Sequence, residues 1–174
     1  MIKTSHPLSV KGIKTIATNF RKEFNIKEDE AFPVLDVIDI LCSKGLLSMQ
    51  VLDNDSEYLG ENRPALYNTV DNFIYIKESV LEEIENGIYR SNFTLAHELF
   101  HYIQNQVFNF TFIEVEECKA SENVEWQANE FAGELLVPSK YLMLEDEELV
   151  ERFHVSLECV LTRKVKQKRR SKIV

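Results

Sequence analysis

The chain has 174 residues, of which 44% are hydrophobic and 28% are charged, and its formal net charge is −9. This length and composition are typical of a globular domain with a substantial core, and they exclude disordered and low-complexity proteins. No apolar run approaches the roughly 20 residues of a membrane span, so we expect no membrane association. We also expect no signal peptide, and three scattered cysteines predict free thiols and a cytoplasmic location.

Charge is unevenly distributed along the chain. Residues 163–174 carry seven basic side chains and no acidic one, which leaves residues 1–162 with 13 basic and 29 acidic side chains and a net charge of −16. Such an acidic body repels the phosphates of nucleic acids, whereas the basic end attracts them locally. We interpret the basic end as a solvated helix terminus with a frayed tail.

The apolar periodicity predicts helices at both ends of the chain and a small sheet between them. Pro33 suits the first turn of a helix, Gly45 suits a C-terminal cap, and Ser156 is an expected N-cap. The predicted elements, in chain order, are helices over 7–23 and 32–47, strands over 47–54 and 65–79, a link over 86–93, helices over 94–103 and 123–137, and two short helices within 145–170. This order predicts an α+β fold in which a small mixed sheet packs on helices. We expect residues 1–137 to form the main domain and residues 138–174 to form a C-terminal helical extension with the basic tail, packed on the same domain.

Two histidines lie four residues apart in the otherwise apolar stretch 94–103. His97 and His101 share one face of an α-helix, roughly 6 Å apart, so their imidazoles can converge on one Zn²⁺. Glu98 lies beside this pair, where it can take a proton from water and later return it to a leaving amine. The spacing is the His-Glu-x-x-His arrangement of metallopeptidases. The alternative is that both histidines are structural residues of a half-buried helix.

A catalytic zinc site requires a third protein ligand. Glu125 and Asn129 share a face of the next predicted helix, which can therefore present a carboxylate to the metal and an amide to the outer nitrogen of a ligating histidine. The spacing of 24 residues between His101 and Glu125 leaves room for a loop and a helix that returns antiparallel. Glu122 and Glu130 are rival ligands, and we expect Glu130 to face solvent.

Three segments resemble the ImmA/IrrE metallopeptidases, a family of small zinc enzymes with a gluzincin-like, zincin-type core. They are RSNFTLAHELFHYI at 90–103, EWQANEFAGELLVP at 125–138 and FHVSLECVLTRKV at 153–165. The resemblance implies that His97, His101 and Glu125 bind zinc, that Glu98 is the general base and that Asn129 is a supporting residue.

The chain departs from the family pattern at two positions. Phe100 stands where the family usually has glycine, and its ring either narrows the space next to the zinc or faces the core behind it. Gln127 replaces an acid that is common at its position, and we expect it on the outer surface.

The predicted function is that of a zinc endopeptidase. An extended substrate can bind by adding a strand to the sheet, and we expect the strand at 73–76 to provide the edge. The candidates for stabilising the oxyanion are Tyr75, Tyr89, Tyr102 and His154. The resemblance implies that the substrate is a helix-turn-helix repressor whose cleavage derepresses a mobile element or a stress operon.

Two alternatives belong to other functional classes. The first is a non-catalytic binding module that keeps the zinc fold and sequesters a repressor or an antitoxin-like partner. An intact Glu98 argues against this alternative, and Phe100 argues for it. The second is a DNA-associated regulator that uses residues 155–170 as a recognition helix, which the net charge of the remaining chain opposes.

Overall fold

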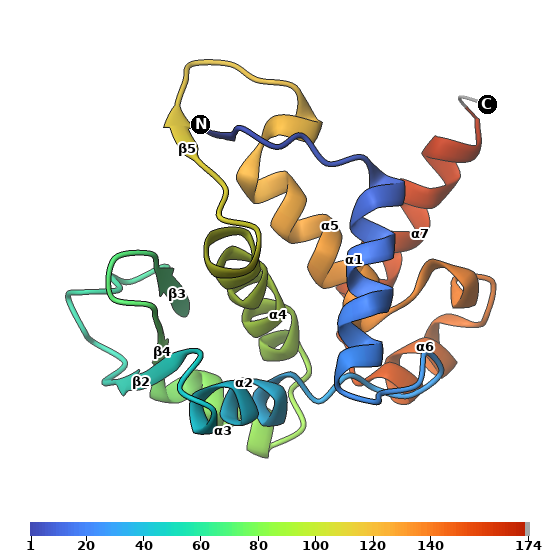
Figure 1. Ribbon diagram of the computed structural model, residues 1–174. Coiled ribbons are helices and arrows are strands. Elements are labelled where there is room, and N and C mark those ends of the chain that lie inside the picture. Colours follow the sequence, from blue (N-terminus) through green and yellow to red (C-terminus); the bar gives the residue numbers. More distant parts are fainter. Residues whose placement is uncertain (173–174) are drawn as a thin grey trace.

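The computed structural model describes residues 1–172, and it shows the α+β fold that the sequence predicts (Figure 1). Residues 173 and 174, the end of the predicted basic tail, lie outside the described residues. The strands are β1 (Ile2–Thr4), β2 (Ser48–Leu52), β3 (Ala65–Asn68), β4 (Phe73–Lys77) and β5 (Phe112–Glu114). The α-helices are α1 (Val10–Glu23), α2 (Val34–Ser43), α3 (Glu78–Glu85), α4 (Arg90–Tyr102), α5 (Val124–Leu136), α6 (Asp146–Phe153) and α7 (Leu157–Ser171). Short helical turns complete the fold: the π-helix η1 (Ile103–Val107) and the 3-10 helices η2 (Ala120–Glu122) and η3 (Ser139–Tyr141).

The helix boundaries follow local capping signals. Ser9 accepts a hydrogen bond from the Gly12 N–H at the start of α1, and Ser156 accepts one from the Cys159 N–H at the start of α7, as predicted for Ser156. Gly45 follows the end of α2 with a φ of +67°, a left-handed conformation that glycine adopts without a steric penalty.

The predicted link over 86–93 extends only to Tyr89, because α4 already begins at Arg90. Residues Glu78–Glu85 form α3, a helix that was not predicted and that includes the last two residues of the strand expected over 65–79. α3 has eight residues, and Val80 is the one that is buried.

The main sheet has three strands in the order β2-β4-β3. β2 pairs with β4 in parallel, and β3 pairs with β4 antiparallel, with Tyr67 opposite Ile74. β4 is therefore the central strand, and the expectation that residues 73–76 provide the sheet edge is wrong. Its side chains Ile74 and Ile76 are fully buried, as expected for a strand covered by neighbours. β1 and β5 form a separate antiparallel pair.

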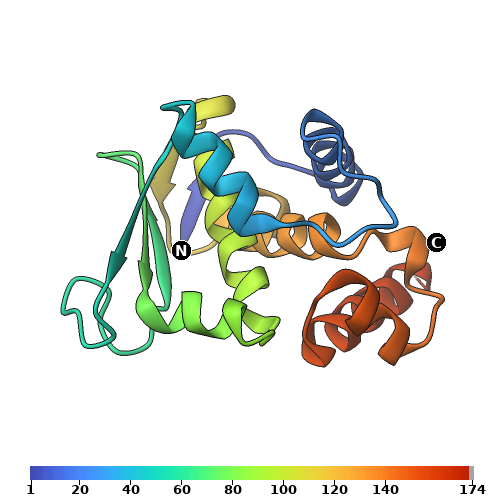
Figure 2. The same ribbon diagram turned by 90° about the horizontal axis from the view of Figure 1, so that it is seen from below.

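Figures 1 and 2 show α4 between the three-stranded sheet and α5, with α1, α6 and α7 on the side of α5 away from the sheet. α4 packs against β3, α2, α3 and α5, and one hydrophobic core continues from the sheet to α7. None of the helices within residues 1–172 combines the length and apolarity needed to cross a membrane.

The basic end of the chain packs against α5. Lys166 and Arg170 form ion pairs of 2.7 and 2.8 Å with Glu130, whose side chain is 2% exposed. Arg163 pairs with the buried Glu134. The expectation of a solvent-facing Glu130 is therefore wrong, because α7 covers this face of α5 and forms ion pairs with its acids. α7 is helical to Ser171, so the chain is not frayed up to that residue, whereas Lys168, Arg169 and Lys172 are exposed, as expected for a solvated helix terminus.

Candidate metal centre

The site lies where α4 and α5 pack side by side. His97 contacts Asn129, while His101, one turn later on α4, contacts Glu125, one turn earlier on α5. The two helices therefore run antiparallel. The Asn123 side chain caps the start of α5, which places Glu125 in the first helical turn.

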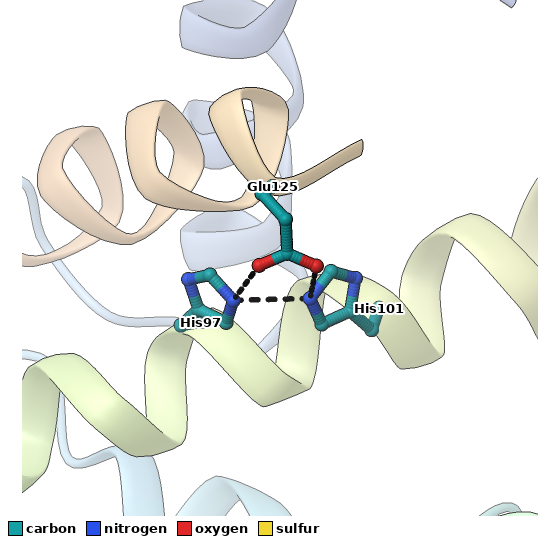
Figure 3. Close-up of side chains that lie close together, drawn as sticks. All are labelled: His97, His101 and Glu125. Carbon is teal, nitrogen blue, oxygen red and sulfur yellow. Dashed lines mark hydrogen bonds and ion pairs between the residues drawn. The ribbon is translucent and has the colours of Figure 1, made fainter. Parts of the chain in front are cut away.

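Three potential ligand atoms converge from the two helices (Figure 3). The Nε2 atoms of His97 and His101 are 3.0 Å apart. His97 Nε2 lies 3.1 Å from Glu125 Oε2, and His101 Nε2 lies 3.5 Å from Glu125 Oε1. Around a tetrahedral Zn²⁺ with bonds of roughly 2.0–2.1 Å, neighbouring ligand atoms are about 3.3 Å apart. The separations and the donor set of two imidazoles and one carboxylate therefore fit a metal ion held by three protein ligands.

The protonation of His101 and Glu125 suits metal binding. Burial and the neighbouring His97 lower the pKa of His101 to about 4, so its imidazole is neutral at physiological pH. Burial also opposes protonation of His97, but the hydrogen bond with Glu125 and the charge of Glu98 outweigh it and raise its pKa. The hydrogen bond with His97 lowers the pKa of Glu125. The site therefore offers an ionised carboxylate and a neutral His101, the forms that coordinate metals.

Glu98 lies beside the ligands and is 8% exposed. Its Oε2 accepts a hydrogen bond of 2.7 Å from the Tyr67 N–H on β3. Burial raises the pKa of Glu98, although the charge of His97 and the Tyr67 hydrogen bond act in the opposite direction. A buried carboxylate with a raised pKa, next to potential metal ligands, is the arrangement expected of a general base.

Glu98 and the three potential ligands line one cavity of about 420 Å³. Its apolar wall is formed by Ile2, Leu66, Phe112 and Val124. β1 and β5, far apart in the sequence, each contribute one of these side chains. Arg63, an exposed cation, also lines the cavity. It lies in the polar loop between β2 and β3, and no motif in the sequence marked it.

A family model described as the IrrE N-terminal-like domain, Peptidase M78, matches residues 66–164. This segment contains α4, α5 and the residues His97, Glu98, His101 and Glu125. The chain belongs to this family. Membership confirms the resemblance to the ImmA/IrrE metallopeptidases that the motifs indicate, and it supports a metallopeptidase-type protein.

The fold is shared with a transcriptional regulator of known structure from Mycobacterium tuberculosis. The TM-score is 0.57 and the sequence identity is 18%, over 87% of this chain and 54% of that chain. This chain thus spans about half the length of the regulator's chain, and at this identity the likeness concerns the fold alone. None of the curated proteins matches the chain.

The outer nitrogens of both histidines contact amide side chains. His97 Nδ1 lies 3.1 Å from Asn129 Oδ1, and His101 Nδ1 lies 3.1 Å from Gln104 Oε1. Asn129 is the supporting residue that the IrrE-type motif implies. Gln104 could not be predicted in this way, because it lies in the π-helical turn η1 directly after α4. The signal available in the sequence is a glutamine three residues after His101.

Both departures from the family pattern lie behind the site. Phe100 is fully buried and stacks on Phe131, with ring centroids 4.4 Å apart, so it faces the core and leaves the cavity open. Gln127 is also fully buried, which makes the expected position on the outer surface wrong. Its amide is hydrogen-bonded to Gln104 and to two backbone carbonyls.

The four candidates for an oxyanion-stabilising group do not line the cavity. Tyr75 donates a hydrogen bond of 2.7 Å to Asp71. Tyr89 stacks on His154 with ring centroids 4.9 Å apart, and Tyr102 is packed in the core.

The rival third ligands are also engaged elsewhere. Glu122 pairs with Lys3 at 3.4 Å, and Glu130 pairs with Lys166 and Arg170 from α7. Among the described residues, only Glu125 joins the two histidines in a group that can hold a metal.

Proposed function

We propose that this chain is a zinc-dependent endopeptidase. The observation that carries the proposal is the convergence of His97, His101 and Glu125 in a cavity that also contains Glu98. This donor set is typical of catalytic zinc in peptidases, and the family supports peptidase chemistry. When bound, zinc would polarise the peptide carbonyl and lower the pKa of the attacking water.

Glu98 is the residue to which we assign proton transfer. It takes a proton from the attacking water and returns it to the leaving amine, so that its charge is restored at the end of the cycle. The hydrogen bond from Tyr67 N–H holds Oε2, and we assign the transfer to Oε1. Burial raises the pKa of Glu98, which brings it closer to the pH at which a general base works best.

The free edge of β3 is the surface to which we assign the substrate backbone. Among the described residues, β3 pairs with a strand on one side only, and the Tyr67 N–H points from its other side to Glu98. An extended peptide added to this edge would pass the base and the three ligands. Leu66 and Phe112 offer apolar contacts to its side chains, and Arg63 offers a positive charge.

The physiological substrate that we propose is a helix-turn-helix repressor, as the resemblance to the ImmA/IrrE enzymes implies. Its cleavage would release the genes that it controls, such as those of a mobile element or a stress operon. The free thiols Cys42, Cys118 and Cys159 support a reducing, cytoplasmic setting for this reaction.

Two other functions have less support. For the DNA-associated regulator, four basic side chains of α7 are engaged in ion pairs within the protein, namely those of Arg163, Lys164, Lys166 and Arg170. For the non-catalytic binding module, the argument from Phe100 is lost, because this ring faces the core.

The test compares cleavage of a candidate repressor by the zinc-loaded wild type and by Glu98→Gln. The rate is expected to fall by about 10²–10⁴-fold, because the variant cannot accept a proton, while bound zinc is retained. Glu85→Gln, which changes an exposed acid on α3, serves as the matched control and should cleave like the wild type. A wild type that binds zinc and the repressor but leaves it intact would favour the binding module.

A further inference from the structure

A relay of hydrogen bonds through the buried amides of Gln104 and Gln127 connects His101 to the backbone of Ser121 and His6. His101 Nδ1 lies 3.1 Å from Gln104 Oε1, and Gln104 Nε2 donates a hydrogen bond of 2.7 Å to Gln127 Oε1. Gln127 Nε2 then donates to the carbonyl oxygens of Ser121, at 2.7 Å, and His6, at 3.2 Å. Both glutamines are fully buried, so no water competes for these groups.

The two backbone carbonyls fix the direction of every hydrogen bond in this relay. A carbonyl oxygen can only accept, so Gln127 must turn its NH₂ group toward Ser121 and His6. Its Oε1 then faces Gln104, which must in turn present its own NH₂ group. Gln104 Oε1 is left facing His101, and an oxygen at that place requires a proton on Nδ1.

We propose that Gln104 and Gln127 are positioning residues that hold His101 as its Nδ1–H tautomer, with the Nε2 lone pair directed at the metal. The group on one ring nitrogen of a histidine decides which nitrogen is free for a metal. The metal-related part of this inference rests on the proposed zinc site, whereas the position of the proton does not.

The His6 carbonyl, at one end of this relay, belongs to the folded N-terminal segment. The His6 ring stacks on Phe110 with centroids 4.5 Å apart, and Thr4 is fully buried where β1 pairs with β5. The relay also depends on η1, the π-helical turn after α4, because this turn carries the buried Gln104 to the outer side of His101. The N-terminal segment thus contributes to the site through the backbone of His6, which follows β1, as well as through the cavity wall.

His97 provides an internal reference. Its Nδ1 contacts Asn129 Oδ1 at 3.1 Å, and this contact is independent of both glutamines. A change that breaks the relay should therefore alter His101 and leave His97 as it is.

The experiment locates the ring protons of both histidines by ¹⁵N NMR, on the chain as isolated and after zinc titration, and measures zinc affinity by competition with a chelator. The variants are Gln104→Met, which removes the partner of His101, and Gln127→Met, which does not touch His101. Gln106→Met changes an exposed glutamine of the same turn and is the matched control.

The wild type is expected to carry the His101 proton on Nδ1. In Gln127→Met, Gln104 is free to turn its amide, so the Nδ1 proton should exchange faster or move to Nε2, and zinc should bind about tenfold more weakly. Gln104→Met should weaken zinc binding by about ten- to a hundredfold. His97 and the Gln106→Met control should be unchanged.

A proton on Nε2 in the wild type, or an unchanged His101 and zinc affinity in Gln127→Met, would overturn the relay. Failure of the proposed function gives a different result, a wild type that takes up no zinc. The proton position on His101 still decides whether the relay exists in that case.

Discussion

The two faces of α5 carry acids in opposite surroundings. Glu130 and Glu134 are buried and paired with cations from α7. Glu125, on the face toward α4, is 57% exposed and lies against two histidine nitrogens. Within residues 1–172, no lysine or arginine forms an ion pair with it.

This difference separates a structural role from a chemical one on the same helix. A buried carboxylate is stable only if a cation and hydrogen bonds replace its water, which fixes α7 on α5. A carboxylate left at a cavity beside two imidazoles is free to bind a cation from outside. Stability should therefore depend on the α7 face, and metal content on the α4 face.

The largest effect on stability is expected from breaking the Glu134–Arg163 pair. Glu134→Gln leaves the Arg163 charge buried without its partner and should lower the free energy of unfolding by about 3–5 kcal/mol. Urea denaturation measures this loss. Replacing both residues by Met should cost less than the single change, since no charge is then left buried. A loss below about 1 kcal/mol in Glu134→Gln would contradict the structural role assigned to the α7 face of α5.

A smaller loss is expected from Gly133→Ala, next to the same pair. An added Cβ would lie 2.6 Å from Arg163 Cδ, so the arginine must shift, at a cost of about 1–3 kcal/mol. Gly12→Ala is the matched control in α1, where the added Cβ meets only ordinary contacts. That change should stabilise the chain by about 0.5–1 kcal/mol, since alanine favours a helix over glycine. Equal effects at the two sites, measured by thermal unfolding, would show that Arg163 is not held against Gly133.

The smallest effect is expected from Glu130→Gln, about 1 kcal/mol at neutral pH, because its two cationic partners are each about a third exposed. Burial alone would raise the pKa of Glu130, but the hydrogen bonds and charges of Lys166 and Arg170 outweigh it and lower the pKa. A lowered pKa stabilises the fold above the unfolded-state value of about 4.3, and this contribution is lost as the pH falls through the folded-state pKa. The difference between wild type and variant should therefore vanish in acid. A difference that persists there would point to packing as its cause.

The two halves of the candidate metal site were predictable because each follows from helical spacing, and the family resemblance indicated Glu125 as the third ligand. His97 and His101 at i and i+4, and Glu125 and Asn129 at i and i+4, each define a helix face without any knowledge of long-range packing. Gln104 depends on a π-helical turn, and the burial of Gln127 and Glu130 depends on which segments cover α5. Those features arise from residues far away in the chain, so the local pattern placed both side chains on the outside.

The sheet shows the same limit. Its strands could be recognised from their composition, but their order could not. The long polar loop at 53–64 joins β2 to β3, which lie on opposite sides of β4, and no local pattern indicates this arrangement. We therefore propose the edge of β3, in place of residues 73–76, as the surface for the substrate. The hydrogen bond from Tyr67 N–H to Glu98 supports this proposal, because it places the base at that edge.

Zinc content per chain tests the central claim most directly. It can be measured by elemental analysis on the wild type, Glu125→Gln and Glu130→Gln. Each variant removes one negative charge, and the two changes lie on different faces of α5. We expect about one zinc in the wild type and in Glu130→Gln, and markedly less in Glu125→Gln. A wild type that stays free of metal after zinc loading, or an equal loss in both variants, would contradict a metal centre built from His97, His101 and Glu125.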